Sequence, residues 1–250
     1  MGDIHLNKVA KVTFAFWIIK IAATTLGETG GDALSMSMNL GYAISSVIFF
    51  GFFLISVVAQ VRAKAFHRFL YWSVIVTTTT VGTTMADYAD RSMGIGYVGG
   101  SLMLFILLIM VIATWKFTLG SVSVNNITSP KTEIFYWVTI LFSNTLGTAL
   151  GDFIADSSGL GYERGALVFF VALLLIALAY FWTTLSRTLL FWMAFILTRP
   201  LGATLGDLLT KPLEHGGLDL SRIGSSIVLM SFMTLCILCT TQERDYASSR

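Results

Sequence analysis

Four segments of the chain share one pattern and decide the fold: TTLGETGGD at 24–32, TTVGTTMAD at 79–87, NTLGTALGD at 144–152 and RPLGATLGD at 199–207. Each copy has a glycine, four further residues and an aspartate. An aromatic–Trp pair precedes that glycine, with nine residues between the Trp and the glycine. The pairs are Phe16-Trp17, Tyr71-Trp72, Tyr136-Trp137 and Phe191-Trp192. An internal repeat of this length sets the architecture of a protein, so the remaining analysis follows from it.

The spacing of the copies indicates how the repeat arose. Successive tryptophans of the pattern are 55, 65 and 55 residues apart, so the first two copies are related to the last two by 120 residues. Duplication in two steps explains this spacing. We place the repeats at 9–62, 66–118, 131–186 and 187–240, with tails at 1–8 and 241–250.

The composition excludes a soluble globular protein. Of the 250 residues, 55% are hydrophobic and 12% are charged, and the mean hydropathy is +0.78. Soluble domains carry roughly 25% charged residues. A net charge of +2 predicts no nucleic-acid partner, and two cysteines cannot form a disulfide framework.

Each repeat contains two apolar stretches long enough to cross a bilayer, which takes about 20 helical residues. We therefore predict an all-α, polytopic integral membrane protein with eight transmembrane helices, arranged as four parallel two-helix repeats. The repeats must be parallel because each one crosses the membrane an even number of times. The predicted first helices are 12–33, 69–89, 134–154 and 188–208, and the second helices are 41–60, 96–115, 163–183 and 223–240.

The distribution of Lys and Arg predicts the orientation. Ten of them lie at the amino end, in the tail or around the loops that join one repeat to the next, whereas the loops inside the repeats hold four, Arg91, Arg164, Lys211 and Arg222. Positive residues favour the cytoplasmic side, so both termini are expected in the cytoplasm. The aromatic–Trp pairs are then expected to form a belt at the cytoplasmic interface. The lipid bilayer is the predicted partner, and a homo-oligomer is possible.

Acidic residues recur at one depth in the predicted first helices. They are the aspartates of the four copies, Asp32, Asp87, Asp152 and Asp207, joined by Glu28 one turn before Asp32. A charged side chain at the bilayer centre costs about 2.5–3.5 kcal/mol on insertion scales. These groups therefore need a wet cavity, a counter-ion or protons. In the alternative interpretation they mark solvated helix ends, an interpretation that also suits Asp90, Asp156, Glu163, Glu214 and Asp219.

Oxygen-bearing side chains near the acids extend the candidate ion-binding site. We assign to it Thr25, Thr80, Asn144 and Thr145 together with the five acids, and the four aspartates are the predicted metal ligands. Oxygen ligands favour hard cations such as Mg²⁺, Mn²⁺ or Ca²⁺, and no other cofactor is predicted. Lys20 and Arg199 are the predicted counter-charges, although Lys20 could instead snorkel to the interface.

The fourfold quartet, ten residues after each aromatic–Trp pair, resembles the bacterial uncharacterised membrane-anchored proteins built from four tandem domain-of-unknown-function 347 repeats. The resemblance covers about residues 9–239. It implies a location in the bacterial inner membrane and the repeat architecture, and it implies no activity.

The function expected from the acids is a transporter or channel that moves a hard cation, most readily a divalent metal, with proton exchange possible. A non-transporting scaffold or sensor with interfacial acids is the alternative. A membrane-embedded metal-dependent enzyme ranks third, and we predict no enzyme, because the chain has no P-loop, no G-x-S-x-G and no H-E-x-x-H motif. The sequence leaves open the ion, the direction and energy source of movement, and the oligomeric state.

Overall fold

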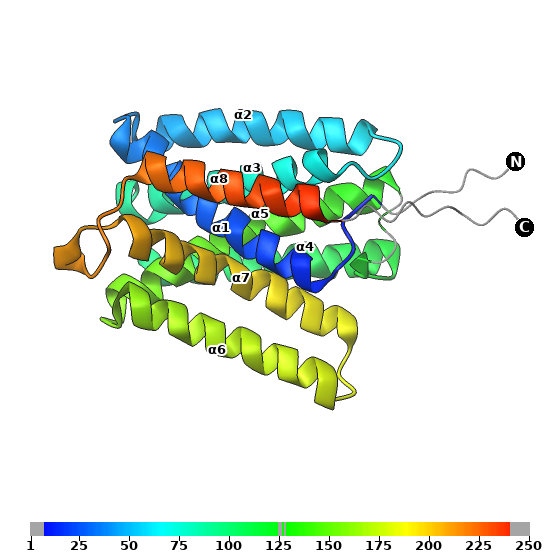
Figure 1. Ribbon diagram of the computed structural model, residues 1–250. Helices are drawn as coiled ribbons and strands as arrows, with labels where there is room; N and C mark the ends of the chain where they lie inside the picture. The colour runs from blue at the N-terminus through cyan, green and yellow to red at the C-terminus, as the bar shows by residue number, and fades with distance from the viewer. Residues whose placement is uncertain (1–7, 125–126, 128, 241–250) are drawn as a thin grey trace, which may run out of the picture.

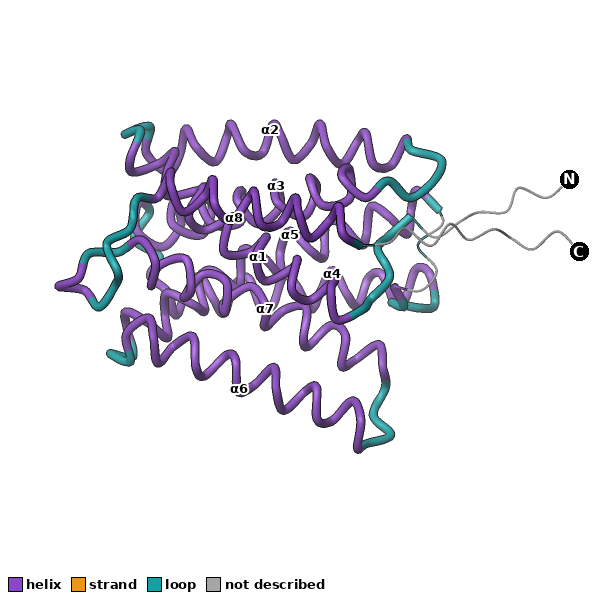
Figure 2. The backbone as a smooth tube through the Cα atoms, viewed as in Figure 1, coloured by secondary structure: helices purple, strands orange, loops and turns teal. Residues whose placement is uncertain are grey.

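The computed structural model describes residues 8–124, 127 and 129–240, and this part of the chain contains helices and no strand (Figure 2). Each repeat supplies two long α-helices joined within the repeat by a short connection. The α-helices are α1 Phe14–Asp32, α2 Gly41–Arg62, α3 Arg68–Asp87, α4 Gly96–Leu119, α5 Pro130–Asp152, α6 Gly161–Trp182, α7 Arg187–Thr210 and α8 Arg222–Cys239.

Local sequence sets where the first helix of each repeat begins. The side chain of the preceding residue accepts a hydrogen bond from a backbone N–H of the first turn at Thr13, His67, Ser129 and Ser186. Such N-caps satisfy donors that the helix itself leaves free. The four first helices begin three, four, seven and five residues before their pattern tryptophans, so the common depth of their later residues comes from the packing of the ring and not from the caps.

The four first helices form the centre of the molecule. α1 packs on α3, α3 on α5, α5 on α7, and α7 packs back on α1, which closes a ring. The second helices lie outside it, and each packs on the first helix of the next repeat: α2 on α3, α4 on α5, α6 on α7 and α8 on α1. In Figure 1, α2 and α6 lie at opposite edges of the bundle, with α1 between them.

Glycines let the central helices approach one another. A Cβ added at Gly27, Gly147 or Gly202 would come closer than 3.0 Å to the neighbouring helix, against Thr79, Arg199 and Thr24 respectively. Gly82 makes the same approach to α5, where a Cβ would lie 3.0 Å from the Thr145 backbone nitrogen. The pattern glycine of every repeat thus packs against the next repeat, so the four helices are parallel and close as a pseudo-fourfold ring.

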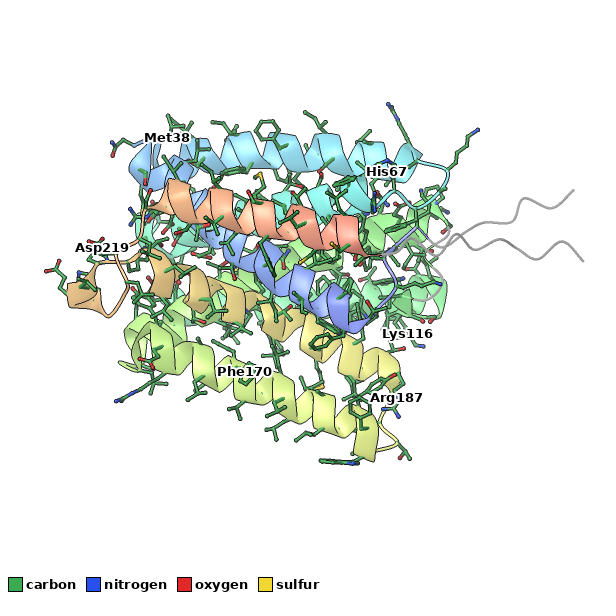
Figure 3. All side chains as sticks on the ribbon, in the orientation of Figure 1. Met38, His67, Lys116, Phe170, Arg187 and Asp219 are labelled. Atoms are coloured by element: carbon green, nitrogen blue, oxygen red, sulfur yellow. The ribbon has the colours of Figure 1, made fainter. Side chains whose placement is uncertain are left out.

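The two ends of the bundle differ. The connections inside the repeats gather at one end, which we call the acidic end, and the connections between repeats lie at the other, where α1 begins and α8 ends (Figure 1). Met38 and Asp219 mark the acidic end in Figure 3, and His67, Lys116 and Arg187 mark the opposite one. Five-residue π-helical turns follow three of the four aspartates, at Ala33–Ser37, Tyr88–Ser92 and Phe153–Ser157.

Six helices are long and apolar enough to span a membrane, as a multi-pass membrane protein requires. They are α2, α4, α6, α7 and α8 together with α5 extended to Ser157. Their outer faces expose large apolar side chains, such as Phe170 on α6, which is labelled in Figure 3. α1 and α3 are less apolar, and both lie in the central ring, where α1 holds Lys20, Glu28 and Asp32.

The expectation that the aromatic–Trp pairs form a belt facing the interface is wrong. Phe16, Tyr71, Tyr136 and all but one of the tryptophans in these pairs are buried. Each aromatic ring of one repeat instead packs on the Trp of the next, and the contacts close in a circle because the repeats do. The pairs are Phe16–Trp72 at 5.5 Å, Tyr71–Trp137 at 5.6 Å, Tyr136–Trp192 at 6.2 Å and Phe191–Trp17 at 5.9 Å between ring centroids.

Candidate acidic site

The five predicted acids come together inside the central ring. Asp32, Asp87 and Asp152 are the last residues of α1, α3 and α5, and Asp207 lies one turn before the end of α7. Glu28 lies one turn deeper on α1. All five side chains are buried, with at most 2% of each residue exposed. The interpretation of these five groups as solvated helix ends is therefore wrong, because helix packing encloses them.

Arg91 joins two of the aspartates. Its Nε lies 3.1 Å from Asp87 Oδ1, one helical turn before it, and its Nη2 lies 3.3 Å from Asp152 Oδ2 on the next helix of the ring. At the rim, Arg91 also approaches Asp156 at 3.8 Å and donates to the Tyr97 hydroxyl at 3.0 Å. One guanidinium therefore offsets the repulsion between two buried carboxylates.

Lys211 does the same for the other two aspartates. Its Nζ lies 3.0 Å from Asp32 Oδ2 and 3.1 Å from Asp207 Oδ1. Arg222, which is partly exposed, reaches Asp32 from the rim at 3.7 Å. The four aspartates are thus held as two bridged pairs, one between α3 and α5 and the other between α7 and α1.

Glu28 pairs with Arg199 at a deeper level. Arg199 Nη2 donates to Glu28 Oε2 at 2.9 Å, to Thr83 Oγ1 at 2.5 Å and to Thr148 Oγ1 at 2.6 Å. Glu28, Thr83 and Thr148 occupy the same position of repeats one, two and three, so the guanidinium lies where three helices meet. Arg199, a predicted counter-charge, therefore forms its ion pair with Glu28 and not with one of the four aspartates.

The geometry of the carboxylates suits a cation shared among them. Glu28 belongs to two groups whose ligand atoms all lie within 4.8 Å of one another, Glu28 with Asp32 and Asp87, and Glu28 with Asp152 and Asp207. Opposite ligands of a Ca²⁺ ion lie about 5 Å apart. Oδ1 of Asp32 and Oδ1 of Asp152 are buried without a hydrogen-bond partner, and the basic groups beside these residues contact Oδ2 instead, which leaves two acceptors free for a cation or a proton.

The other predicted ion ligands make different contacts. The hydroxyls of Thr25, Thr80 and Thr145 each donate to the carbonyl four residues earlier in their own helix, at 3.0, 2.8 and 2.9 Å. Asn144 Nδ2 donates to Thr78 Oγ1 at 3.2 Å. The structure thus brings together the five acids and Arg199, and it gives these four polar residues partners outside the acidic cluster.

Lys20 is buried and lies apart from the acids. Its residue is 0% exposed, so snorkelling to the interface is excluded. Nζ lies 4.2 Å from the centroid of the Phe195 ring, and among the described residues it has no hydrogen-bond partner. The counter-charges that contact the aspartates are instead Arg91, Lys211 and, at the rim, Arg222, all of which the sequence placed in loops inside the repeats.

The structure also places one further acid and the two cysteines. Asp90, expected at a solvated helix end, is buried against Gly100 of α4. Burial raises the pKa of the Asp90 carboxyl to about 6, and the neighbouring Arg91 opposes the rise. Cys236 and Cys239 are free and line a surface groove of about 410 Å³ beside Thr13, at the opposite end of α1 from the acids.

Comparison with known proteins identifies the repeat. A family model described as Repeat of Unknown Function (DUF347) matches four tandem segments, residues 15–66, 70–120, 135–186 and 190–244. No curated protein and no solved structure matches the chain. The four matched segments each contain one aromatic–Trp pair and one glycine–aspartate pattern, which agrees with the repeats found in the sequence.

Proposed function

Because the chain belongs to the family defined by this repeat of unknown function, its site is built from four versions of one unit, and we propose that the four units bind one hard cation and move it across a membrane. The observation that carries the proposal is the convergence of five buried carboxylates, with unpartnered oxygens, on the axis of the ring. A divalent metal ion is the favoured substrate, and protons exchange with it.

The charges of the cluster support a divalent ion. Five buried carboxylates face three basic groups, those of Arg91, Arg199 and Lys211, which leaves two negative charges. Arg222 and Asp156 at the rim offset each other. Buried charge without a partner is costly, so the empty cluster needs either one divalent cation or two protons. Exchange of the metal for two protons therefore leaves the buried charge unchanged.

The layers below the acids favour a transporter that changes conformation over an open channel. Toward the opposite end from the acids, the ring is filled by Ile75, Ile140, Phe195 and Lys20, each fully buried, and then by the circle of aromatic pairs. Layers that are largely apolar and carry a positive charge exclude a hydrated cation. The ion would enter from the acidic end and leave after the central helices move apart at the aromatic end.

The arrangement of the helices in a central ring and an outer layer supports a placement of all eight in a membrane. We assign α1 and α3 as spanning helices beside the six apolar ones, because their polar residues face the ring and the other helices shield them from lipid. The helices have 18 to 24 residues, and a helix rises about 1.5 Å per residue, so each matches a hydrocarbon core of about 30 Å. The proposed location is a bacterial inner membrane with both termini in the cytoplasm.

The test is flux into proteoliposomes that contain a Mn²⁺-quenched dye. We expect the wild type to admit Mn²⁺ down its gradient and the double variant Asp87→Asn/Asp152→Asn to be at least tenfold slower. Asp219→Asn is the matched control, because Asp219 is exposed and its φ of 52° is one that Asn tolerates. Absence of Mn²⁺, Ca²⁺, Mg²⁺ and proton flux in the wild type would exclude transport.

One observation favours a scaffold or sensor as the second candidate. Each aspartate of the ring already pairs with Arg91 or Lys211, so the acids can stabilise the bundle without an ion. A scaffold predicts that divalent ions leave the unfolding temperature of the purified protein unchanged. A transporter predicts a saturable rise, and the same protein preparation separates the two.

A further inference from the structure

Two cationic side chains lie buried in the ring with donors that have no acceptor. On the terminal side of the acidic cluster, the unpartnered atoms are Lys20 Nζ, Arg199 Nε and Arg199 Nη1. Both residues are 0% exposed. Arg199 donates to Glu28 and to the two threonines through Nη2 alone, so its Nε and Nη1 are left without an acceptor.

The two cations are neighbours. Phe195, whose ring carries the Lys20 ammonium on its face at 4.2 Å, precedes Arg199 by one turn of α7. At the same depth, the Thr79 hydroxyl lies against Gly27 of α1 and also has no partner. Asn144 Oδ1, at the equivalent position of repeat three, is an acceptor without a partner. This layer therefore holds more unpartnered donors than acceptors, together with positive charge.

The positive charge of this layer limits which kind of ligand it can bind. Glu28 offsets Arg199, whereas Lys20 has no carboxylate within 4.0 Å among the described residues. Water brings as many donors as acceptors and carries no charge, so it leaves the charge of Lys20 uncompensated. A metal ion would add further positive charge. A single anion accepts several N–H and O–H bonds at once and cancels the charge.

We propose that Lys20 and the free side of Arg199 form a binding site for one small monovalent anion of the halide type, in a layer of the ring distinct from the acidic cluster. The site does not depend on cation transport by the acids. Its residues come from repeats one and four only, because repeats two and three have Ile75 and Ile140 where repeat one has Lys20. The divergence of the four units thus provides one anion site in an otherwise cation-binding ring.

The first experiment measures thermal unfolding of the detergent-purified protein in sodium gluconate with increasing sodium chloride at constant ionic strength. We expect a saturable rise in the unfolding temperature for the wild type. Lys20→Met, which keeps the length of the side chain and removes its charge, is expected to weaken chloride binding at least tenfold. Lys64→Met, in an exposed loop, is the matched control and is expected to respond as the wild type does.

The second experiment locates the anion directly. Crystals of the wild type grown with bromide are expected to give an anomalous peak beside Lys20 Nζ, and the peak is expected to vanish in Lys20→Met. No chloride-specific stabilisation in the wild type, or equal stabilisation in Lys20→Met, would overturn the proposal. Mn²⁺ stabilisation measured in gluconate separates this result from the cation site, since Lys20→Met should retain it.

Discussion

Arg91 and Lys211, 120 residues apart in the chain, each join the aspartate of their own repeat to the aspartate of the next repeat around the ring. The offset of 120 residues is also the offset between the two halves of the chain. The acidic end therefore has twofold pseudo-symmetry, although the helices and glycines below it follow a fourfold pattern. Specialisation of the repeats is greatest at this end and on the axis beneath it.

Lys211→Met is expected to destabilise the protein, because it leaves Asp32 and Asp207 buried without their shared partner. Removing one member of a buried ion pair costs about 3–5 kcal/mol. The measurement is thermal unfolding in detergent, followed by tryptophan fluorescence. Adding Asp207→Asn to the same chain should recover part of the loss, whereas Lys64→Met alone should have little effect. Equal stabilities of Lys211→Met and Lys64→Met would contradict the bridging role.

Gly202→Ala tests the close packing of α7 on α1. The new Cβ would meet both the side chain and the backbone of Thr24, so the helices must separate. Overpacking of this kind typically costs about 1–3 kcal/mol. Gly51→Ala is the matched control, because nothing lies within 4 Å of a Cβ there and alanine is the better helix former. An unfolding temperature of Gly202→Ala at or above that of the control would show that the contact is dispensable.

Much of this architecture could be predicted from the sequence because it depends on periodicity. The repeats, the two helices of each unit and the common depth of Asp32, Asp87, Asp152 and Asp207 all follow from the spacing of a few residues. Glu28 is one turn before Asp32, so its place on the same face also follows from helix geometry.

The contacts across the ring could not be predicted, because a repeat shows which positions are equivalent and not which unit lies beside which. The inward turn of Arg91 illustrates this limit. In the sequence Arg91 lies in the connection inside repeat two, where it was used only to predict membrane orientation. In the structure the π-helical turn Tyr88–Ser92 continues α3 and keeps Arg91 beside Asp87. Arg91 follows Asp87 by four residues, and Lys211 follows Asp207 by the same four residues. This shared spacing was the signal that could have identified both bridges.

Tyr71→Phe tests the polar contact within the aromatic circle. The hydroxyls of Tyr71 and Tyr136 lie 2.7 Å apart and both residues are buried, so removing one leaves the other without a partner. An unsatisfied buried polar group costs about 1–3 kcal/mol. The double variant Tyr71→Phe/Tyr136→Phe should be more stable than either single variant, as measured by chemical or thermal unfolding. Additive losses in the double variant would show that the hydroxyls do not depend on each other.

Glu28→Gln is expected to weaken cation binding more than any other single carboxamide substitution in the cluster, because Glu28 alone belongs to both groups of potential ligands. A ligand present at 100 times its dissociation constant stabilises a folded protein by about 2.7 kcal/mol. Manganese gluconate should therefore raise the unfolding temperature of the wild type, and the rise should be nearly lost in the variant.

Two further variants make the Glu28 result interpretable. Glu28→Gln leaves the charge of Arg199 uncompensated, so Glu28→Gln/Arg199→Met removes both members of the pair and should restore stability without restoring the response to manganese. Glu163→Gln, on the exposed face of α6, should respond to manganese as the wild type does. A full response in the double variant would show that the ion binds without Glu28, and the ligand set would then have to be sought among the four aspartates alone.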